Sequence, residues 1–80
     1  MDLFEKIEKV FEYNNISYDG IWDGYRGGSD ICIDFENKDD LDDADTILYQ
    51  YDFEFESDYN DLYIVIYDNE HNNSINIEEE

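Results

Sequence analysis

The chain has 80 residues, enough for one domain, and its 24 acidic residues stand against four Lys and Arg, a formal net charge of −20. Hydrophobic residues make up 41% and aromatic residues 18%, which excludes a disordered acidic chain. A domain of this size buries only somewhat more than about 60% of its unfolded surface, so we expect a modest core. The charge disfavours nucleic acids and anionic membranes as partners and favours a basic surface.

Cys32 is the single cysteine, which excludes an internal disulfide and fits a reducing cytosol. The chain begins Met-Asp-Leu-Phe-Glu-Lys, without the basic and then apolar segments of a secretion signal. No apolar run approaches the roughly 20 residues of a membrane span. We therefore expect a cytoplasmic protein.

Residues 2–13 are predicted to form an amphipathic helix. The apolar positions follow the i, i+3, i+4, i+7 spacing: Leu3, Phe4, Ile7, Val10 and Phe11. Asp2 stands where a helix prefers an acidic N-cap, and Asn14-Asn15 is a plausible end. The simplest interpretation is a helix that covers the core.

Residues 16–29 contain four glycines and predict a short or irregular strand followed by a turn at Arg26-Gly27-Gly28-Ser29. These glycines lack the Gly-Lys-Ser/Thr ending of a phosphate-binding loop. Residues 30–36 then alternate as a half-buried strand. Ile31, Ile33 and Phe35 share one face, and the other face carries Asp30, Cys32, Asp34 and Glu36.

Residues 37–46 fit a helical turn or a loop equally well, with Asp39 or Asp40 as a possible cap. Residues 47–56 alternate, so we expect a strand that buries Ile47, Tyr49, Tyr51, Phe53 and Phe55 and exposes Gln50, Asp52, Glu54 and Glu56. A tight turn at 57–60 and a central strand at 62–67 follow.

Together these elements predict an α+β fold of two layers, with the N-terminal helix packed on a three- to four-stranded, mainly antiparallel sheet. We expect residues 1–68 to form the single domain. Residues 69–80 are expected to be an acidic, frayed tail, in which Ile75 and Ile77 could add a short edge strand.

The segment from Asp30 to Asp61 carries thirteen acids and one base, Lys38. Because it also contains strand patterns, we expect the charge to be mounted on ordered structure, at a density comparable with the phosphates of a nucleic acid. The predicted partner-binding residues are Asp30, Asp34, Glu36, Asp39, Asp40, Asp42, Asp43, Asp45, Asp52, Glu54, Glu56 and Asp58.

Catalysis and dedicated metal binding are not predicted, and no cofactor is expected. His71 is the only histidine and lies in the expected tail, while acidic neighbours disfavour the thiolate of Cys32. An EF-hand register that starts at Asp40 puts Ala44 at a ligand position and Asp45 where glycine is required. Loose, unspecific binding of divalent cations by the acids is all that this segment indicates.

In its composition and in the placement of acids from Asp34 to Asp58, the chain resembles phage-encoded DNA mimics: anti-CRISPR proteins, anti-restriction proteins and uracil-glycosylase inhibitors. The resemblance implies no particular fold. It implies competitive occupation, in a bacterial host cell, of the basic groove of a nucleic-acid-binding protein. We favour the anti-CRISPR branch because RNA-guided nucleases hold nucleic acid in positively charged channels.

Two other functions compete with this interpretation. An acidic immunity protein or antitoxin would neutralise one cognate nuclease through a shape-specific patch that needs fewer charges. An acidic structural domain, or one that binds divalent cations, would use the same charge for its own solvation or for ions.

Overall fold

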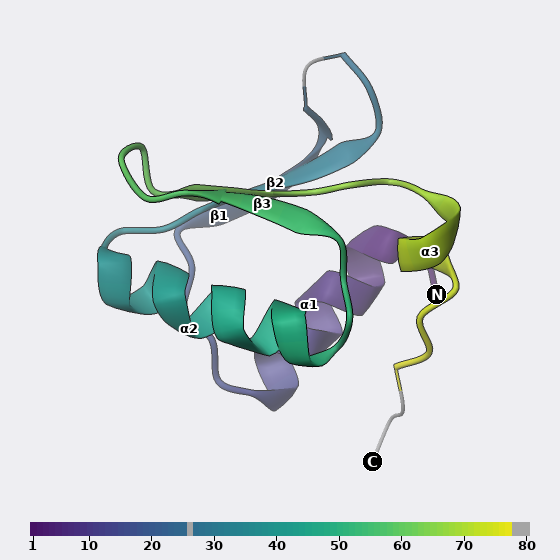
Figure 1. Ribbon diagram of the computed structural model, residues 1–80, viewed down its shortest axis with the longest axis horizontal. Coiled ribbons are helices and arrows are strands. Elements are labelled where there is room, and N and C mark those ends of the chain that lie inside the picture. The colour runs from purple at the N-terminus through teal and green to yellow at the C-terminus, as the bar shows by residue number, and fades with distance from the viewer. Residues whose placement is uncertain (26, 78–80) are drawn as a thin grey trace.

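The computed structural model describes residues 1–25 and 27–77 and shows a four-stranded sheet with two helices packed on one of its faces (Figure 1). In chain order the elements are α1 (Leu3–Tyr13), β1 (Gly20–Tyr25), β2 (Asp30–Asp34), α2 (Lys38–Gln50), β3 (Phe55–Asp58), β4 (Tyr63–Ile66) and α3 (Glu70–Asn73). The predicted two-layer α+β fold is thereby confirmed, with a second long helix added to the helical layer.

Helix α1 forms where the apolar spacing predicted it. Its buried residues are Leu3, Ile7, Val10 and Phe11. The side chain of Asp2 accepts a hydrogen bond of 2.9 Å from the backbone N–H of Glu5, so the predicted N-cap is confirmed. The helix ends at the predicted asparagines, because Asn15 adopts the left-handed conformation (φ 55°) and lets Ile16 N–H donate to the carbonyl of Phe11.

The sheet is antiparallel throughout and has the order β1-β2-β4-β3. Strand β4 lies between β2 and β3, so the chain crosses from β2 through α2 to the far edge and returns as β4. On the face toward the helices lie Ile21, Ile33 and Ile64 in one cross-strand row and Ile31 and Ile66 in the next. These isoleucines pack on α1 and α2 and form the centre of the core.

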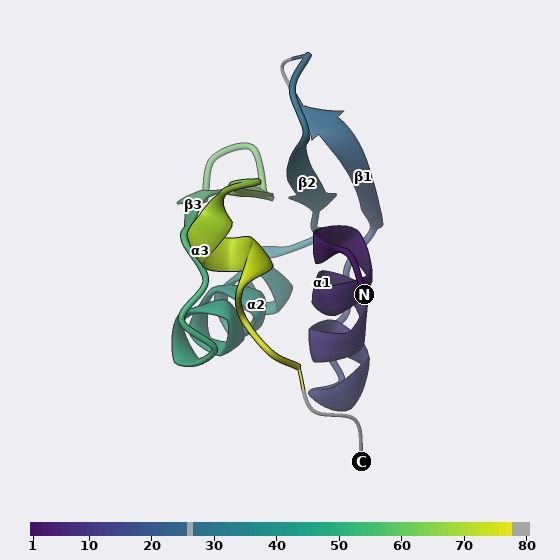
Figure 2. The ribbon, with the colours of Figure 1, turned by 90° about the vertical axis from the view of Figure 1, so that its right-hand side faces the viewer.

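The β1–β2 hairpin carries a bulge. Trp22 pairs with Cys32 and Tyr25 with Asp30, so β1 has one residue more than β2 between the two pairs. Gly24 lies within this bulge and adopts φ +83°, a backbone conformation that residues with a side chain disfavour. The strands of the hairpin extend away from the helices in both views (Figure 1, Figure 2). The predicted turn at 26–29 includes Arg26, which lies outside the described residues.

The predicted strand at 47–56 is wrong, because residues 47–50 belong to α2 and only Phe55 and Glu56 lie in a strand. This helix begins after Asn37, whose side chain accepts a 2.9 Å hydrogen bond from the backbone of Asp40, so neither Asp39 nor Asp40 is the cap. Its buried residues are Leu41, Ala44 and Leu48. Of the aromatic side chains expected in the core, Phe53 is buried, whereas Tyr49 is 79% exposed.

The end of α2 explains this error. Asp52 adopts φ 69°, and its N–H donates to the carbonyl of Tyr49 while Phe53 N–H donates to that of Leu48. This pair of bonds is a Schellman motif, which stops the helix and turns the chain toward β3. The alternation of apolar residues from 47 to 55 therefore spans a helix end, a turn and the start of a short strand.

The segment from 69 to 77 also differs from the expected frayed tail. Asn69 caps the single helical turn α3 by accepting a 2.8 Å bond from the N–H of Asn72, whose own side chain is fully buried. Ile75 and Ile77 pack on the core but are not in a strand. The folded unit therefore extends beyond residue 68 within the described chain.

Candidate functional site

The candidate site is the face of the sheet turned away from α1 and α2, which we call the outer face. The cross-strand register places Trp22, Cys32, Val65 and Glu56 in one row across it. A second row holds Asp34, Tyr63 and Asp58. No helix of the described chain lies on this side of the sheet (Figure 1).

Aromatic side chains nevertheless cover the centre of the outer face. Cys32 and Val65 are each only 2% exposed. The rings of Tyr25 and Tyr63 approach to 6.0 Å between centroids, although their strands lie on opposite sides of β2. Cys32 is on β2, the strand between them, and the register places it on the same face as the two rings. We call Trp22, Tyr25, Tyr63 and Tyr67 the aromatic platform.

Hydrogen bonds hold part of this platform in place. The hydroxyl of Tyr63 is hydrogen-bonded to Tyr25 and also to Asp58, and these bonds, together with burial, raise the pKa of Tyr63 to about 12. Burial, reinforced by the charge of Asp34, raises the pKa of the Cys32 thiol to about 11. The platform is therefore ordered, and the cysteine on the same face is a poor nucleophile. Trp22 at its edge remains 42% exposed.

Four of the predicted site residues lie on the outer face around the platform: Asp30, Asp34, Glu56 and Asp58. Two of them are fixed by backbone donors. Asp30 accepts a 2.8 Å bond from the N–H of Asp68, and Asp58 accepts bonds from the N–H groups of Asn60 and Asp61. Burial, with the nearby charge of Asp19, raises the pKa of Asp34.

The strands that carry these acids contain no base. Residues 20–25, 30–34, 55–58 and 63–66 include no Lys, Arg or His. Same-face neighbours along a strand lie about 6.6–6.8 Å apart and adjacent strands about 4.8 Å apart. The outer face therefore presents carboxylates at fixed spacing around an aromatic centre.

The acids of α2 divide between two sides of that helix. On the side of β3, Asp45 accepts a 2.6 Å bond from the hydroxyl of Ser57, and Asp42 accepts a 3.2 Å bond from Tyr59. Burial, with the charge of Asp45, raises the pKa of Tyr59. Asp42 and Asp45 therefore continue the acidic surface around the β3 edge.

The remaining acids of α2 do not join this surface. Asp43 lines a separate pocket of about 260 Å³ with Asn14 and Ile47. Asp39 is exposed in the first turn, and Asp40 interacts with the N-cap Asn37. Acids in the first turn of a helix are stabilised by its dipole, which is a structural role.

The predicted row of Asp52, Glu54 and Glu56 on one strand is wrong, since only Glu56 lies within β3. Glu54 precedes the strand and accepts a 2.9 Å bond from the side chain of Asn69. Asp52 lies in the turn after α2, where its carboxylate is 3.5 Å from the ring of His71. Glu36 is exposed in the connection between β2 and α2.

His71 is also bonded to the backbone of Asp52, its ring Nε2 lying 2.6 Å from the carbonyl oxygen. This contact, with the charges of Glu54 and Asp52, raises the pKa of His71. The remaining ion pair among the described residues joins Lys9 and Glu12 at 3.9 Å on α1. Neither pair involves an acid of the outer face.

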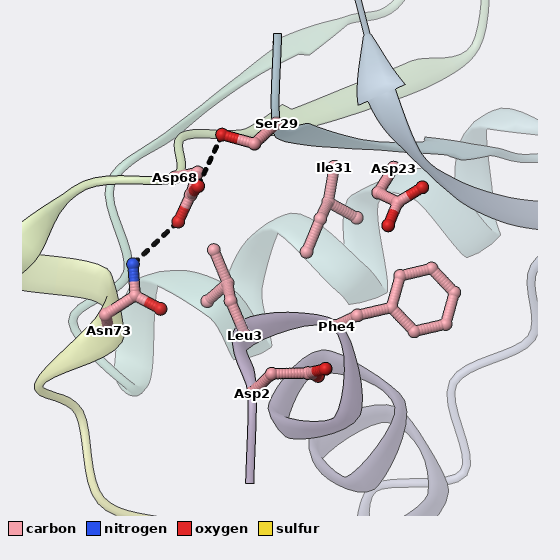
Figure 3. A pocket seen from close by; sticks show the side chains of 8 residues that line it. All are labelled: Asp2, Leu3, Phe4, Asp23, Ser29, Ile31, Asp68 and Asn73. Atoms are coloured by element: carbon pink, nitrogen blue, oxygen red, sulfur yellow. Dashed lines mark hydrogen bonds between the residues drawn. The ribbon is translucent and has the colours of Figure 1, made fainter.

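A pocket of about 300 Å³ lies between the start of α1, the β1–β2 hairpin and α3 (Figure 3). Leu3, Phe4 and Ile31 line it together with the carboxylates of Asp2, Asp23 and Asp68. Ser29 and Asn73 both donate hydrogen bonds to Asp68, which lowers the pKa of that carboxyl. These bonds tie the hairpin to α3, so we assign Asp68 a structural role.

Sequence reasoning missed several residues that position the site. Asn37 and Asn69 each cap the start of a helix. The acidic residues that follow each asparagine in the first helical turn are the sequence signal for this role. Ser57 and Tyr59 join β3 to α2 only through the tertiary fold. Within residues 1–25 and 27–77 there is no cluster of three or more His, Cys, Asp or Glu arranged to bind a metal ion.

The structure thus defines an acidic α+β domain of two layers, in which no helix of the described residues covers the outer face of the sheet. Comparisons with known protein families, with curated proteins and with solved structures find no match for the chain. In the part of the chain that the structure describes, no helix has both the length and the apolar character needed to cross a lipid bilayer.

Proposed function

We propose that this protein is a nucleic-acid mimic that inhibits a DNA- or RNA-binding protein by occupying its basic groove. The supporting observation is the outer face, on which Asp30, Asp34, Glu56 and Asp58 surround an ordered aromatic centre on base-free strands. The partner class is a basic nuclease such as a CRISPR effector or a restriction enzyme, and the anti-CRISPR role is the form of this proposal that we favour.

The electrostatics of the surface suit this role. A groove that binds duplex DNA accommodates about one charge per 1.7 Å of helix axis, counting both strands. The carboxylates on β2 and β3, extended by Asp42 and Asp45, offer negative charge without flexible linkers. Because the fold already orders them, binding costs little additional conformational entropy. Association with a basic groove is steered by charge and is therefore sensitive to salt.

The proposal is tested with purified guide-loaded CRISPR effectors and restriction enzymes, measuring DNA cleavage with and without this protein. We expect inhibition that excess duplex DNA relieves and that weakens as salt rises. The double variant Asp34→Asn/Glu56→Gln should reduce inhibition. The matched control is Glu8→Gln/Glu12→Gln, which removes the same charge from α1 on the opposite side of the sheet.

An inhibition constant that stays flat from low to high salt would contradict the proposal. So would equal loss of inhibition in the two double variants, because only net charge would then matter. Asp34→Asn also removes a carboxyl whose pKa is raised in the folded protein, so this variant should keep its thermal stability. Loss of inhibition can then be separated from unfolding.

A second candidate is an acidic immunity protein that neutralises one cognate nuclease, and the exposed Trp22 favours it. Tryptophan at the centre of such an interface commonly accounts for a large part of the binding energy. In that case Trp22→Ala should lower affinity more than about 30-fold, corresponding to the loss of at least about 2 kcal/mol at a hot spot. For a nucleic-acid mimic we expect the loss to be distributed over the carboxylates.

A further inference from the structure

The aromatic platform has a chemistry that phosphate mimicry alone does not require. A mimic needs only carboxylates, yet the outer face places an exposed indole and three half-buried phenol rings between them. The rings of Tyr25 and Tyr63 are in contact, and the hydroxyl of Tyr63 is bonded to Asp58. Flat ring faces beside carboxylates are thus held in place before any partner arrives.

We propose that this platform selects arginine over lysine, so that the partner surface bound by the outer face is rich in arginine. This inference rests on the proposed function and specifies the chemistry of the partner. The occupant is the guanidinium group, which stacks on the indole of Trp22 while a carboxylate such as Asp34 accepts its N–H donors.

The physical argument is the difference between the two basic side chains. Guanidinium is planar, weakly hydrated and able to stack on an aromatic face while it donates two parallel hydrogen bonds to a carboxylate. The lysine ammonium is a compact, strongly hydrated charge that gains mainly from the carboxylate. In the register, Trp22 of β1 is paired with Cys32 of β2. Asp34 lies two residues beyond Cys32 on β2 and on the same face of the sheet. Such diagonal neighbours are about 7–8 Å apart, within reach of one arginine side chain.

Charge complementarity also decides against a second copy of this chain as the occupant. A dimer through the outer face would bring together two molecules of net charge −20 and would bury acids on both sides without a base from any strand. A basic partner removes this repulsion. Sedimentation of the protein alone is therefore expected to show no dimer that depends on Trp22.

The experiment uses two synthetic peptides of equal length and charge, one with arginine and one with lysine alternating with glycine. Trp22 is the only tryptophan, so its fluorescence reports directly on the outer face, and calorimetry gives the affinities of variants that lack it. We expect the arginine peptide to bind about fivefold more tightly than the lysine peptide at the same salt, as one exposed cation–π contact provides. Trp22→Leu should abolish this preference, and Trp22→Phe should retain part of it.

The matched control is Tyr49→Leu, which removes an aromatic ring that is 79% exposed on α2, away from the outer face. It should leave the arginine preference unchanged. Equal affinity of the two peptides for the wild-type protein would overturn this inference and leave the proposed function standing. Failure of both peptides to bind at low salt would overturn the proposed function itself. A preference that persists in Trp22→Leu, or a dimer that this variant abolishes, would also overturn the inference.

Discussion

The side chain of Asn72 holds the backbone of Glu54 by two hydrogen bonds of 2.8 Å, accepting from its N–H and donating to its carbonyl. The same amide group donates to the carbonyl of Tyr67 at 2.7 Å. Asn72 is fully buried, and its bonds link the start of β3 to the end of β4. A side chain outside the sheet thereby completes the pairing of the two strands that carry Glu56, Asp58 and Tyr63.

We predict that Asn72→Ala lowers the free energy of unfolding by about 2–4 kcal/mol, since it leaves buried backbone groups without partners. Asn72→Asp should be at least as damaging at pH 7, because a carboxylate oxygen would then face the carbonyls of Glu54 and Tyr67. Urea denaturation measures both. Stability of Asn72→Asp equal to wild type at pH 7 would contradict these hydrogen bonds of Asn72.

Two substitutions in α2 distinguish the observed helix from the strand that the sequence pattern predicted. Leu48→Ala removes a fully buried side chain and should cost about 2–5 kcal/mol. Tyr49→Ala removes an exposed one and should change stability by no more than about 0.5 kcal/mol. A strand that buries Tyr49 would give the reverse order, so thermal melts of the two variants decide between the structures.

The contact of His71 with Asp52 predicts a pH dependence near neutrality. The pKa of His71 is raised in the folded protein, so its contribution to stability is fully present below its ordinary value of 6.5 and is lost as pH rises through the raised pKa. The melting temperature should therefore increase as pH falls from 8 to 6 in the wild-type protein. In His71→Gln this change should be smaller, and a change of equal size would contradict the assignment.

Cys32 provides a chemical test of the aromatic platform. Because the thiol is 2% exposed and its pKa is raised to about 11, its reaction with a disulfide reagent at pH 8 should be slow in the folded protein and fast after denaturation. Tyr63→Ala removes one of the two paired rings on the same face and should accelerate the reaction several-fold. Tyr49→Ala is the control, because Tyr49 lies on α2 and not on the outer face, and it should leave the reaction rate of Cys32 unchanged.

If Cys32 reacts as rapidly in the wild-type protein as in denatured protein, the platform does not cover it. Acceleration in Tyr63→Ala must be compared with the stability of that variant, because global unfolding also exposes the thiol. Measuring the reaction at two concentrations of urea separates the two routes, since only global opening depends steeply on denaturant.

The local patterns of the sequence determined α1, β2 and β4. Asp2 and Asn14 bound the helix, and in β2 Ile31 and Ile33 alternate with polar or small residues. The β4 segment is instead a short run that is apolar on both faces, as expected of a central strand. The same patterns determined the two-layer α+β class and the excess of acid over base. These properties depend on neighbours in the chain, which is why they could be predicted without the fold.

Only the tertiary structure decided the extent of α2 and the composition of the site. Between Ile47 and Phe55 the apolar residues fit both the strand period and the helix period, and the left-handed Asp52, supported by packing of Leu48 and Phe53, selects the helix. The order β1-β2-β4-β3 then brings Tyr25 and Tyr63 together on the face that carries Cys32 and places Asp42 and Asp45 beside β3. Contacts between residues so distant in the chain depend on which strands are neighbours in the sheet. The strand order in turn depends on how the whole core is buried, which no local sequence pattern specifies.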